Sequence, residues 1–279
     1  MSERRLMLVH AHPDDESTGT GATMARYCSE GATVSLVTCT SGELGEVVSD
    51  ELAHLRGDPD ALGEHRRGEI EKALAELGDV RHHWLGGPGR FKDSGMADTE
   101  GNTAPGSFAA ADRAEVTRAM VELLRAERPH VVITYDDFGG YGHPDHIAAN
   151  LAVMHALDPA ADPDYEPELG EAWQVPKVYW TALPESILER AKEVGVDFQP
   201  RTVPDAELTA VLEGGEFHEA KLNALRQYPS QVVVDDDGFF ATMIRQPEFA
   251  NEHFLLVRGE RGPGEGPYNR EPCLFAGID

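Results

Sequence analysis

The stretch RLMLVHAHPDDE, residues 5–16, places a histidine, a proline and three acidic residues directly after a short apolar run. A short, uniformly apolar run is typical of a strand buried on both faces of a parallel sheet. Three adjacent carboxylates repel one another, so we expect a cationic group to compensate them. A second HPD lies at residues 143–145, within GYGHPDHI, and it also follows an apolar run.

Strands and helices are predicted to alternate along most of the chain around these two segments. Short β-rich or apolar runs predict strands at residues 5–11, 32–40, 80–86, 130–137 and 177–183. Apolar residues at helical spacing predict helices at residues 21–31, 64–78, 112–130, 143–157 and 216–231. This alternation predicts an α/β fold, Rossmann-like, with a mostly parallel sheet and helices on both faces.

The last third of the chain shows a more irregular pattern. Residues 157–172 are acidic and rich in proline, which predicts an exposed loop, and residues 232–244 predict a hairpin that turns at Asp237 and Gly238. The sequence has no internal repeat and no clear linker. We therefore expect one domain over residues 1–279, in which residues 1–156 form the α/β core with the metal site and residues 157–279 shape the substrate pocket.

Composition narrows the classes of partner. The 279 residues carry 50 acidic and 24 basic side chains, for a net charge of −26, while 41% of the residues are hydrophobic. A sizeable core is therefore expected, but clustered basic residues that would neutralise phosphates are scarce. The composition argues against nucleic acid and an anionic membrane surface as partners, and it leaves small neutral substrates open.

Three cysteines, at positions 28, 39 and 273, form no CxxC pair, so a reducing compartment is expected. The apolar part of the N-terminal segment is shorter than the roughly 7–15 residues of a signal-peptide core. No apolar run approaches the roughly 18 residues of a membrane span. These features predict a cytoplasmic protein, and they do not indicate an oligomeric state.

The two HPD segments are expected to meet at one edge of the sheet, because ligands of open parallel sheets bind outside the carboxyl ends of the strands. His12 and Asp15 lie on one side of a turn, and His146 offers a third ligand from the second segment. Imidazole and carboxylate suit Zn²⁺, and a catalytic zinc keeps a position open for water. Asp14 would remain beside the metal as a general base, and the same ligands would also accept Fe²⁺.

The second segment offers further groups for catalysis. His143 and His146 are three residues apart, so both could face one site, and Asp145 is expected to hold the His143 ring and favour its cationic form. Tyr141 is placed to donate a hydrogen bond to a developing oxyanion. The neighbouring glycines suit a loop whose backbone approaches a ligand closely.

Simpler interpretations stay open for several of these patterns. A single HPD is usually the start of a helix, with proline in its first turn, and the other histidines 10, 82 and 83 are expected to be structural. TGTGAT at residues 18–23 lacks the third glycine of a dinucleotide-binding loop, since Met24 stands there. Cys39 is expected to be a buried strand residue and not a nucleophile.

Taken together, AHPDDE after an N-terminal strand, RRGE at residues 66–69 and HPDH after TYD resemble the PIG-L/LmbE family of zinc-dependent N-deacetylases. The resemblance covers at least residues 4–155. Within the family, HAHPDDES, VTCTSGELGEV, GGPGRFKDSGM and TYDDFGGYGHPDH look closest to the mycothiol-biosynthesis branch, which removes acetate from N-acetylglucosaminyl-inositol. KLNALRQYPSQVVV at residues 221–234 is similar too. A sister branch, the mycothiol S-conjugate amidases, shares most motifs but has proline where this chain has Gly142.

The resemblance implies roles for nine residues. It implies three zinc ligands: His12, Asp15 and His146. It implies a catalytic group: Asp14 as base, His143 to stabilise or protonate the tetrahedral intermediate, Asp145 oriented against His143, and Tyr141 to polarise the amide carbonyl. It implies two sugar or inositol contacts: Arg66 and Asp93. The expected activity is hydrolysis of an amide on an amino sugar, with another N-acetyl-sugar deacetylase, the conjugate amidase, or a non-catalytic binding protein as alternatives.

Overall fold

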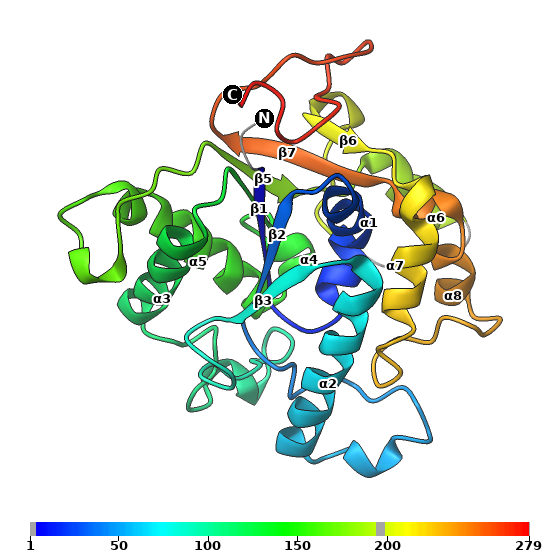
Figure 1. Ribbon diagram of the computed structural model, residues 1–279. Coiled ribbons are helices and arrows are strands. Elements are labelled where there is room, and N and C mark those ends of the chain that lie inside the picture. The colour runs from blue at the N-terminus through cyan, green and yellow to red at the C-terminus, as the bar shows by residue number, and fades with distance from the viewer. Residues whose placement is uncertain (1–3, 194–198, 279) are drawn as a thin grey trace.

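Within the described residues, 4–193 and 199–278 of a computed structural model, seven strands form one sheet in the order β3-β2-β1-β4-β5-β7-β6 (Figure 1). Their bounds are β1 Arg5–His10, β2 Thr33–Thr38, β3 Val80–Trp84, β4 Val131–Thr134, β5 Lys177–Thr181, β6 Ala210–Leu212 and β7 Glu252–Arg258. Strands β1 to β5 are parallel, whereas β7 runs antiparallel to both β5 and β6. The predicted mostly parallel α/β sheet is confirmed.

Helices connect the strands and cover both faces of the sheet. Their bounds are α1 Asp15–Ser29, α2 Pro59–Leu77, α3 Arg113–Glu127, α4 Gly139–Gly142, α5 Pro144–Ala161, α6 Glu185–Glu193, α7 His218–Leu225 and α8 Phe239–Ile244. Short 3-10 turns lie at Ala53–Leu55, Glu100–Thr103, Pro167–Leu169, Asp205–Glu207, Gly215–Phe217 and Pro247–Ala250. No helix among the described residues has the length and apolar character needed to traverse a lipid bilayer.

Local sequence explains where the long helices begin. The Asp58 side chain accepts a hydrogen bond from the Ala61 N–H at 3.1 Å, and Pro59 occupies the first turn of α2. The Asp112 side chain accepts from the Glu115 N–H at 3.0 Å and begins α3 in the same way. Such caps satisfy backbone donors that a helix leaves unpaired at its first turn.

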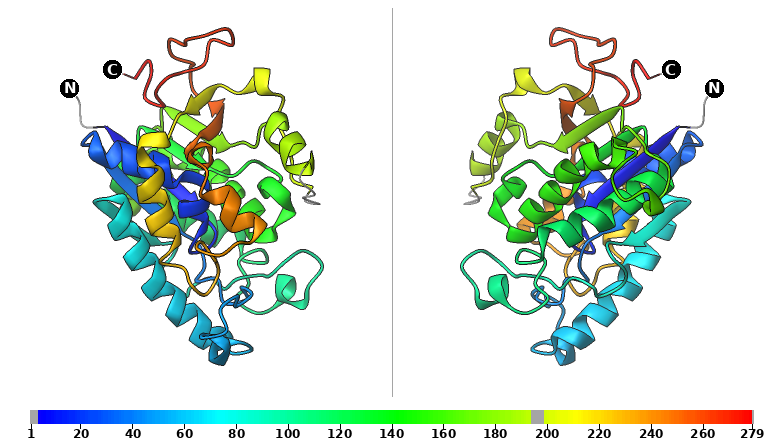
Figure 2. Two further views of the ribbon diagram at one scale, coloured as in Figure 1. Left: turned by 90° about the vertical axis from the view of Figure 1, so that its right-hand side faces the viewer. Right: turned by 90° about the vertical axis from the view of Figure 1, so that its left-hand side faces the viewer.

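The core lies in two layers on opposite faces of β1. Helices cover both faces of the sheet (Figure 2). Met7 and Val9 pack with residues of α3 and α5, whereas Leu6 and Leu8 pack with residues of α1, α2 and α7. Successive strand residues point to opposite faces, so a strand covered on both sides needs apolar residues at consecutive positions. The uninterrupted run at residues 6–9 meets this requirement.

Two predictions in the last third are wrong, and two strands, β6 and β7, were not predicted. Residues 232–244 form no hairpin, because Gly238 caps α8 and its N–H bonds the Asp236 side chain at 2.8 Å. Helix α5 continues to Ala161, so the first residues of the expected loop 157–172 are helical. Strand β7 was not predicted, and its antiparallel partners lie far away along the chain.

The strand order changes direction between β1 and β4. The chain leaves β1 toward β2 on one side, and it leaves β4 toward β5 on the other side. A crevice therefore opens at the carboxyl ends of β1 and β4, where ligands of this sheet type bind. Both HPD segments begin at this crevice, since one follows β1 and the other follows β4.

Candidate active site

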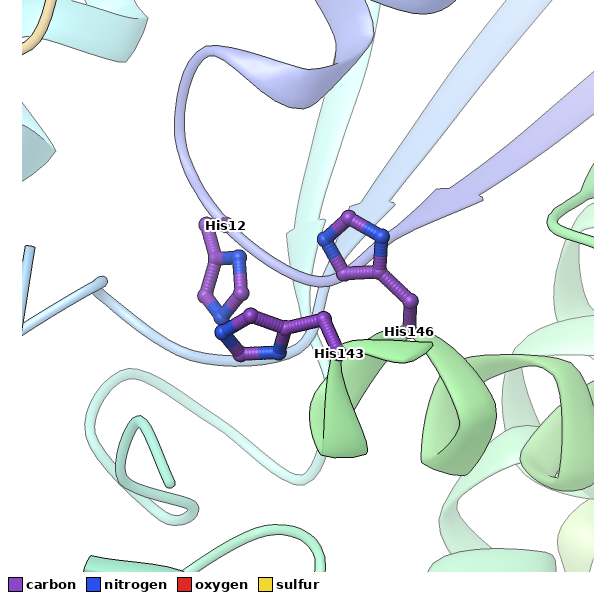
Figure 3. A group of neighbouring side chains, drawn as sticks. All are labelled: His12, His143 and His146. Carbon is purple, nitrogen blue, oxygen red and sulfur yellow. The ribbon is translucent and has the colours of Figure 1, made fainter. Parts of the chain in front are cut away.

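Three histidines converge at the carboxyl ends of β1 and β4 (Figure 3). His12 lies on the loop between β1 and α1, whereas His143 and His146 lie at the start of α5. The ring centroid of His12 is 4.7 Å from that of His143 and 5.4 Å from that of His146. One ring nitrogen from each residue lies within 4.8 Å of the others, so the three residues could hold a metal ion.

A buried ring nitrogen without a hydrogen bond supports this metal site. Nε2 of His146 makes no hydrogen bond and lies 3.4 Å from the carboxylate oxygen Oδ2 of Asp15. Buried polar atoms are normally satisfied, and an imidazole nitrogen beside two other imidazoles is suited to a divalent cation. A second group of possible metal ligands combines His12 and His143 with the carboxylates of Asp93 and Asp145. One ligand atom from each of these four residues also lies within 4.8 Å of the others.

The three predicted ligands His12, Asp15 and His146 lie together. Oδ2 of Asp15 is 3.3 Å from Nδ1 of His12 and 3.4 Å from Nε2 of His146. It also accepts the His12 backbone N–H at 2.9 Å, which closes the turn of the HPDD motif. The structure therefore brings one carboxylate oxygen between two imidazoles, which is the donor set expected for zinc.

Charge in the site is balanced by His12. Burial lowers its pKa, but the facing carboxylates of Asp93, Asp145 and Asp15 outweigh burial and raise the pKa of His12 well above its ordinary value. Burial likewise opposes ionisation of Asp15, yet His146 and His12 hold its pKa well below the ordinary value. The acidic cluster thus favours a positive charge at its centre, and a metal ion would displace the His12 proton.

Asp14, next to Asp15 in the chain, forms an ion pair with Arg66. Its backbone has φ 110°, a left-handed conformation that is rare for residues other than glycine. Burial is the largest influence and raises its pKa to about 7, against the opposing charge of Arg66, whose Nη2 is 3.4 Å from Oδ1. A carboxylate with a pKa near neutrality is suited to general-base chemistry.

The Arg66 side chain hydrogen-bonds backbone carbonyls of the loops around it. The side chain is nearly fully buried, and its guanidinium donates to the Gly42 carbonyl at 2.7 Å and to the Pro13 carbonyl. These bonds join α2 to the HPDD turn and hold the backbone beside Asp14. The prediction that Arg66 contacts sugar stays a prediction, and the observed contacts favour a positioning role.

The expected pairing of Asp145 with His143 differs from the observed arrangement. The carboxylate of Asp145 accepts from the N–H and hydroxyl of Ser94 and lies 3.1 Å from Nε2 of His12. The hydrogen bond between the two residues comes from the Asp145 backbone N–H, which donates to Nδ1 of His143 at 3.2 Å as a helix cap. The Asp145 carboxylate lies within 4.8 Å of a His143 ring nitrogen and its charge opposes the lowering of the His143 pKa by burial, but its hydrogen bonds go to Ser94 and His12.

His143 is held neutral in the metal-free chain. Burial is the main cause, with the charges of His12 and His146 adding to it, and together they lower its pKa to about 4. This corrects the expectation of a cationic ring. Because Nδ1 accepts the Asp145 N–H, the proton of the neutral ring lies on Nε2. His143 therefore presents an N–H donor at Nε2.

Asp93 and Tyr141 lie on loops that border the histidines. Oδ1 of Asp93 accepts from the Gly95 N–H at 2.8 Å and is 3.6 Å from Nε2 of His12, while Oδ2 accepts from the Leu44 N–H at 3.1 Å. Tyr141 is 37% exposed, its ring centroid is 5.1 Å from that of His146, and burial raises the pKa of its hydroxyl. Tyr141 is thus a phenol that can donate a hydrogen bond.

Two functional candidates were missed from sequence. Ser94 binds both oxygens of Asp145, and Tyr135 bonds Asp15 while its ring stacks on His146. Tyr135 has a sequence signal, since TYD follows the β4 segment at the predicted ligand-binding edge. Ser94 has none, because KDSG is a common turn sequence. Cys39 is buried as expected, and burial raises the pKa of its thiol, which opposes a nucleophilic role.

A cavity of about 590 Å³ adjoins the site on the side of the loop between β2 and α2. Its wall includes Glu43 and Leu44, and both residues hydrogen-bond Asp93. Apolar side chains of Val47, Leu55 and Leu62 form much of the remaining surface. A volume of this size suits a small-molecule ligand.

Comparison with known proteins places the chain in a family. The family model described as PIG-L: GlcNAc-PI de-N-acetylase matches residues 7–157. One relative, from Saccharopolyspora erythraea, is named 1D-myo-inositol 2-acetamido-2-deoxy-alpha-D-glucopyranoside deacetylase 2. Its sequence is 72% identical to this one, and the alignment covers 98% of this chain and 100% of the relative. A Streptomyces avermitilis deacetylase named for the same compound is 47% identical, over 100% of this chain and 98% of its own.

A solved structure supports the fold independently. The N,N'-diacetylchitobiose deacetylase of Pyrococcus horikoshii aligns with a TM-score of 0.66 at 19% identity, over 92% of this chain and 84% of its own. The expected resemblance is confirmed by the match over residues 7–157 and by the full-length relatives. The chain belongs to the PIG-L family of de-N-acetylases.

Proposed function

We propose that this protein is a zinc-dependent hydrolase that removes the N-acetyl group of 1D-myo-inositol 2-acetamido-2-deoxy-α-D-glucopyranoside, a step of mycothiol biosynthesis. The observation that carries this proposal is the 72% identity, over the whole length of both chains, with a relative named for that activity. The cluster of His12, Asp15 and His146 at the strand edge supports a hydrolytic metal site.

The described residues fit a metal ion. His12, Asp15 and His146 would hold it, with Nε2 of His146, which makes no hydrogen bond, as one ligand atom. A bound Zn²⁺ would act as a Lewis acid toward the amide and lower the pKa of a coordinated water toward about 7. Two imidazoles with one carboxylate would also accept Fe²⁺.

Asp14 is the proposed general base. Its carboxylate lies beside the ligand turn, and its pKa of about 7 in the metal-free chain would fall next to a cation, because a nearby positive charge favours the anion. The anion accepts a proton from the attacking water. Arg66 holds the Asp14 carboxylate and the preceding carbonyl in place.

Tyr141 and His143 are the proposed donors on the other side of the substrate. The Tyr141 hydroxyl keeps its proton and can hydrogen-bond the carbonyl oxygen as negative charge develops on it. The N–H at Nε2 of His143 can donate a hydrogen bond to the same oxygen, and the proton that Asp14 has taken from the water can pass to the departing amine, which returns Asp14 to its anionic form. Asp93 and the cavity beside it are proposed to receive the sugar or the inositol.

The C-terminal part, residues 157–279, is proposed to complete the pocket. The Arg201 N–H bonds the Gly140 carbonyl at 2.6 Å, and its guanidinium pairs with Asp137 and lies over the Phe138 ring. These contacts hold the loop that carries Tyr141. The three cysteines are free thiols, which supports a reducing compartment and hence a cytoplasmic location.

The test is amine release by purified protein loaded with zinc, measured in parallel on the N-acetylated pseudodisaccharide and on a mycothiol S-conjugate. Faster turnover of the pseudodisaccharide, by at least 10-fold in kcat/KM, is expected. Preference for the conjugate would identify an amidase instead. Zinc binding without turnover of either compound would contradict the catalytic assignment and favour a non-catalytic binding protein.

A further inference from the structure

Tyr135 follows β4 and places its side chain beneath the histidine cluster. It is 7% exposed, and its hydroxyl has three partners. The hydroxyl donates to Oδ2 of Asp15 at 2.8 Å, accepts the Ala11 N–H at 2.9 Å, and lies 3.3 Å from Nδ1 of His10. One phenol oxygen thus links the end of β1 to the carboxylate at the start of α1.

The ring of Tyr135 contacts a second member of the cluster. It stacks on the imidazole of His146, with centroids 4.0 Å apart and an interplanar angle of 15°. Stacking fixes the plane of His146, and the hydrogen bond fixes one oxygen of Asp15. Oδ2 of Asp15 lies 3.4 Å from Nε2 of His146. This contact joins the side of the site on α1 to the side on α5.

A buried chain of contacts supports the phenol from behind. Nε2 of His10 lies 2.8 Å from Oγ1 of Thr20, which itself bonds the Glu16 carbonyl at 3.1 Å. Thr20, a residue in this series of contacts, has non-helical backbone angles, φ −143° and ψ 15°, so the helix α1 is interrupted at that position. The position of Tyr135 is therefore set by β1, β4 and α1 together.

We infer that Tyr135 is a positioning residue for metal binding, acting through Asp15 and His146; the inference rests on the proposed function. Ligand side chains bind a metal tightly only when their orientation is fixed before binding, and their hydrogen-bonded supports commonly change metal affinity 10–100-fold. Tyr135 supports two ligands by two different interactions. The phenylalanine variant separates them, because it keeps the stacked ring and removes only the hydroxyl.

The experiment compares Tyr135→Phe with a matched control, Tyr27→Phe. Tyr27 is also fully buried and also accepts a backbone N–H through its hydroxyl, from Leu274 at 2.9 Å, but it lies away from the site. The dissociation constant for Co²⁺ is measured by competition with a chelator, and the visible absorption of bound Co²⁺ reports the ligand geometry. Thermal unfolding shows whether each variant is folded.

Tyr135→Phe is expected to weaken Co²⁺ binding about 10–100-fold and to alter the absorption bands, while Tyr27→Phe binds Co²⁺ as the wild type does. Wild-type affinity and bands in Tyr135→Phe, or the same loss in both variants, would overturn the inference. If Tyr135→Phe does not fold, 3-fluorotyrosine at position 135 preserves the shape and changes the acidity of the hydroxyl. Altered Co²⁺ bands then support the inference, and unaltered bands overturn it.

Failure of the proposed function gives a different pattern. A wild type that binds Co²⁺ but releases no amine from the pseudodisaccharide removes the proposed activity, while the comparison of the two tyrosine variants still decides the role of Tyr135. A wild type that binds no Co²⁺ would overturn both.

Discussion

At the scale of single residues, three consecutive acids have three separate environments. Asp14 faces Arg66 and has a pKa of about 7, Asp15 lies between His12 and His146 and has a depressed pKa, and Glu16 is fully buried against Ser17 and Tyr228. Burial raises the pKa of Glu16, although these two hydrogen bonds oppose the shift. The repulsion expected from the sequence is therefore relieved by different partners, and each acid can have a different function.

Replacing Asp14 should separate catalysis from metal binding. Asn is the suitable substitute, because it tolerates the left-handed backbone at φ 110° better than Ala does. Asp14→Asn is expected to keep bound zinc and lose about 10²–10⁴-fold in kcat. His12→Ala is expected to lose the zinc itself. Elemental analysis and amine-release rates check both variants, with the surface variant Asp60→Asn as control; near-normal turnover of Asp14→Asn would refute the assignment as base.

The sequence identified which residues gather at the site better than it identified their contacts. His12, Asp15, His143 and His146 could be expected together, because their spacing and the strand ends fix where they lie. The partner of Asp145 could not be predicted, since Ser94 comes from a long loop whose path depends on tertiary packing. Tyr135 was open to prediction from its place after β4, but only the packing shows that its ring reaches His146.

At the scale of elements, α1 depends on a buried ion pair from the C-terminal part. The interruption at Thr20 is followed by two backbone N–H groups, of Ala22 and Thr23, that donate to Glu252 on β7 at 3.0 and 2.8 Å. Lys221 on α7 pairs with the same carboxylate at 2.7 Å. The acid therefore acts as an internal cap for the second half of α1.

Removing this carboxylate should be costly. Glu252→Ala leaves the charge of the buried Lys221 ammonium uncompensated, with the Phe249 carbonyl as its remaining hydrogen-bond acceptor, and removes the acceptor of two N–H groups, so the free energy of unfolding should fall by about 3–5 kcal/mol. Urea unfolding followed by circular dichroism measures the loss. The double variant Lys221→Met/Glu252→Ala should recover part of it, because the uncompensated charge is gone. A loss below about 1 kcal/mol in Glu252→Ala would contradict the capping role.

Strand β3 gives the protein a sensitivity to acid. Burial, with a smaller contribution from His83, lowers the pKa of His82 to about 4, and its Nε2 lies 2.9 Å from Oγ1 of Thr38. The unfolded chain binds a proton at this residue near pH 6.5, whereas the folded chain does so only near pH 4. This contribution to stability is complete above about pH 6.5 and is lost as the pH falls toward 4.

The free energy of unfolding should therefore fall over that range, by on the order of 2–3 kcal/mol from His82. Denaturant unfolding at several pH values measures the slope, and His82→Gln should show a shallower one. His82→Gln with an unchanged slope would place the acid sensitivity elsewhere, for instance at His253, whose pKa burial and Arg270 also lower to about 4.

Elements were predictable where their signals are local. Helix α5, which carries His146, has a cap and a proline at its start, and β1, β2 and β4 have apolar runs. The turn residues Asp237 and Gly238 led to the wrong prediction of a hairpin. An aspartate side chain that accepts a backbone N–H two residues later can close a hairpin turn, but here the bond from Gly238 to Asp236 begins α8. Strand β7 depends on pairing with β5 and β6 across long stretches of chain, which local sequence does not encode.

At the scale of the whole molecule, the acidic surplus sets the response to salt. A net charge of −26 on one sheet with its covering helices produces self-repulsion in the folded state. Raising NaCl from about 10 mM to about 150 mM shortens the screening length to about 8 Å. Tm is expected to rise over this range, as calorimetry can measure. Variants with exposed acids replaced by amides should show a smaller rise, and a falling Tm would contradict the argument.

The two halves of the candidate site join positions far apart in the sequence. His12 and Asp145, in contact at 3.1 Å, are 133 residues apart along the chain. During synthesis, β1 can pair with β2 and β3 well before β4 leaves the ribosome, so the first HPD turn forms without its partners. A nascent chain therefore lacks part of the proposed ligand set until α5 has been translated, and a metal ion would find the full set only at the later stages of biogenesis.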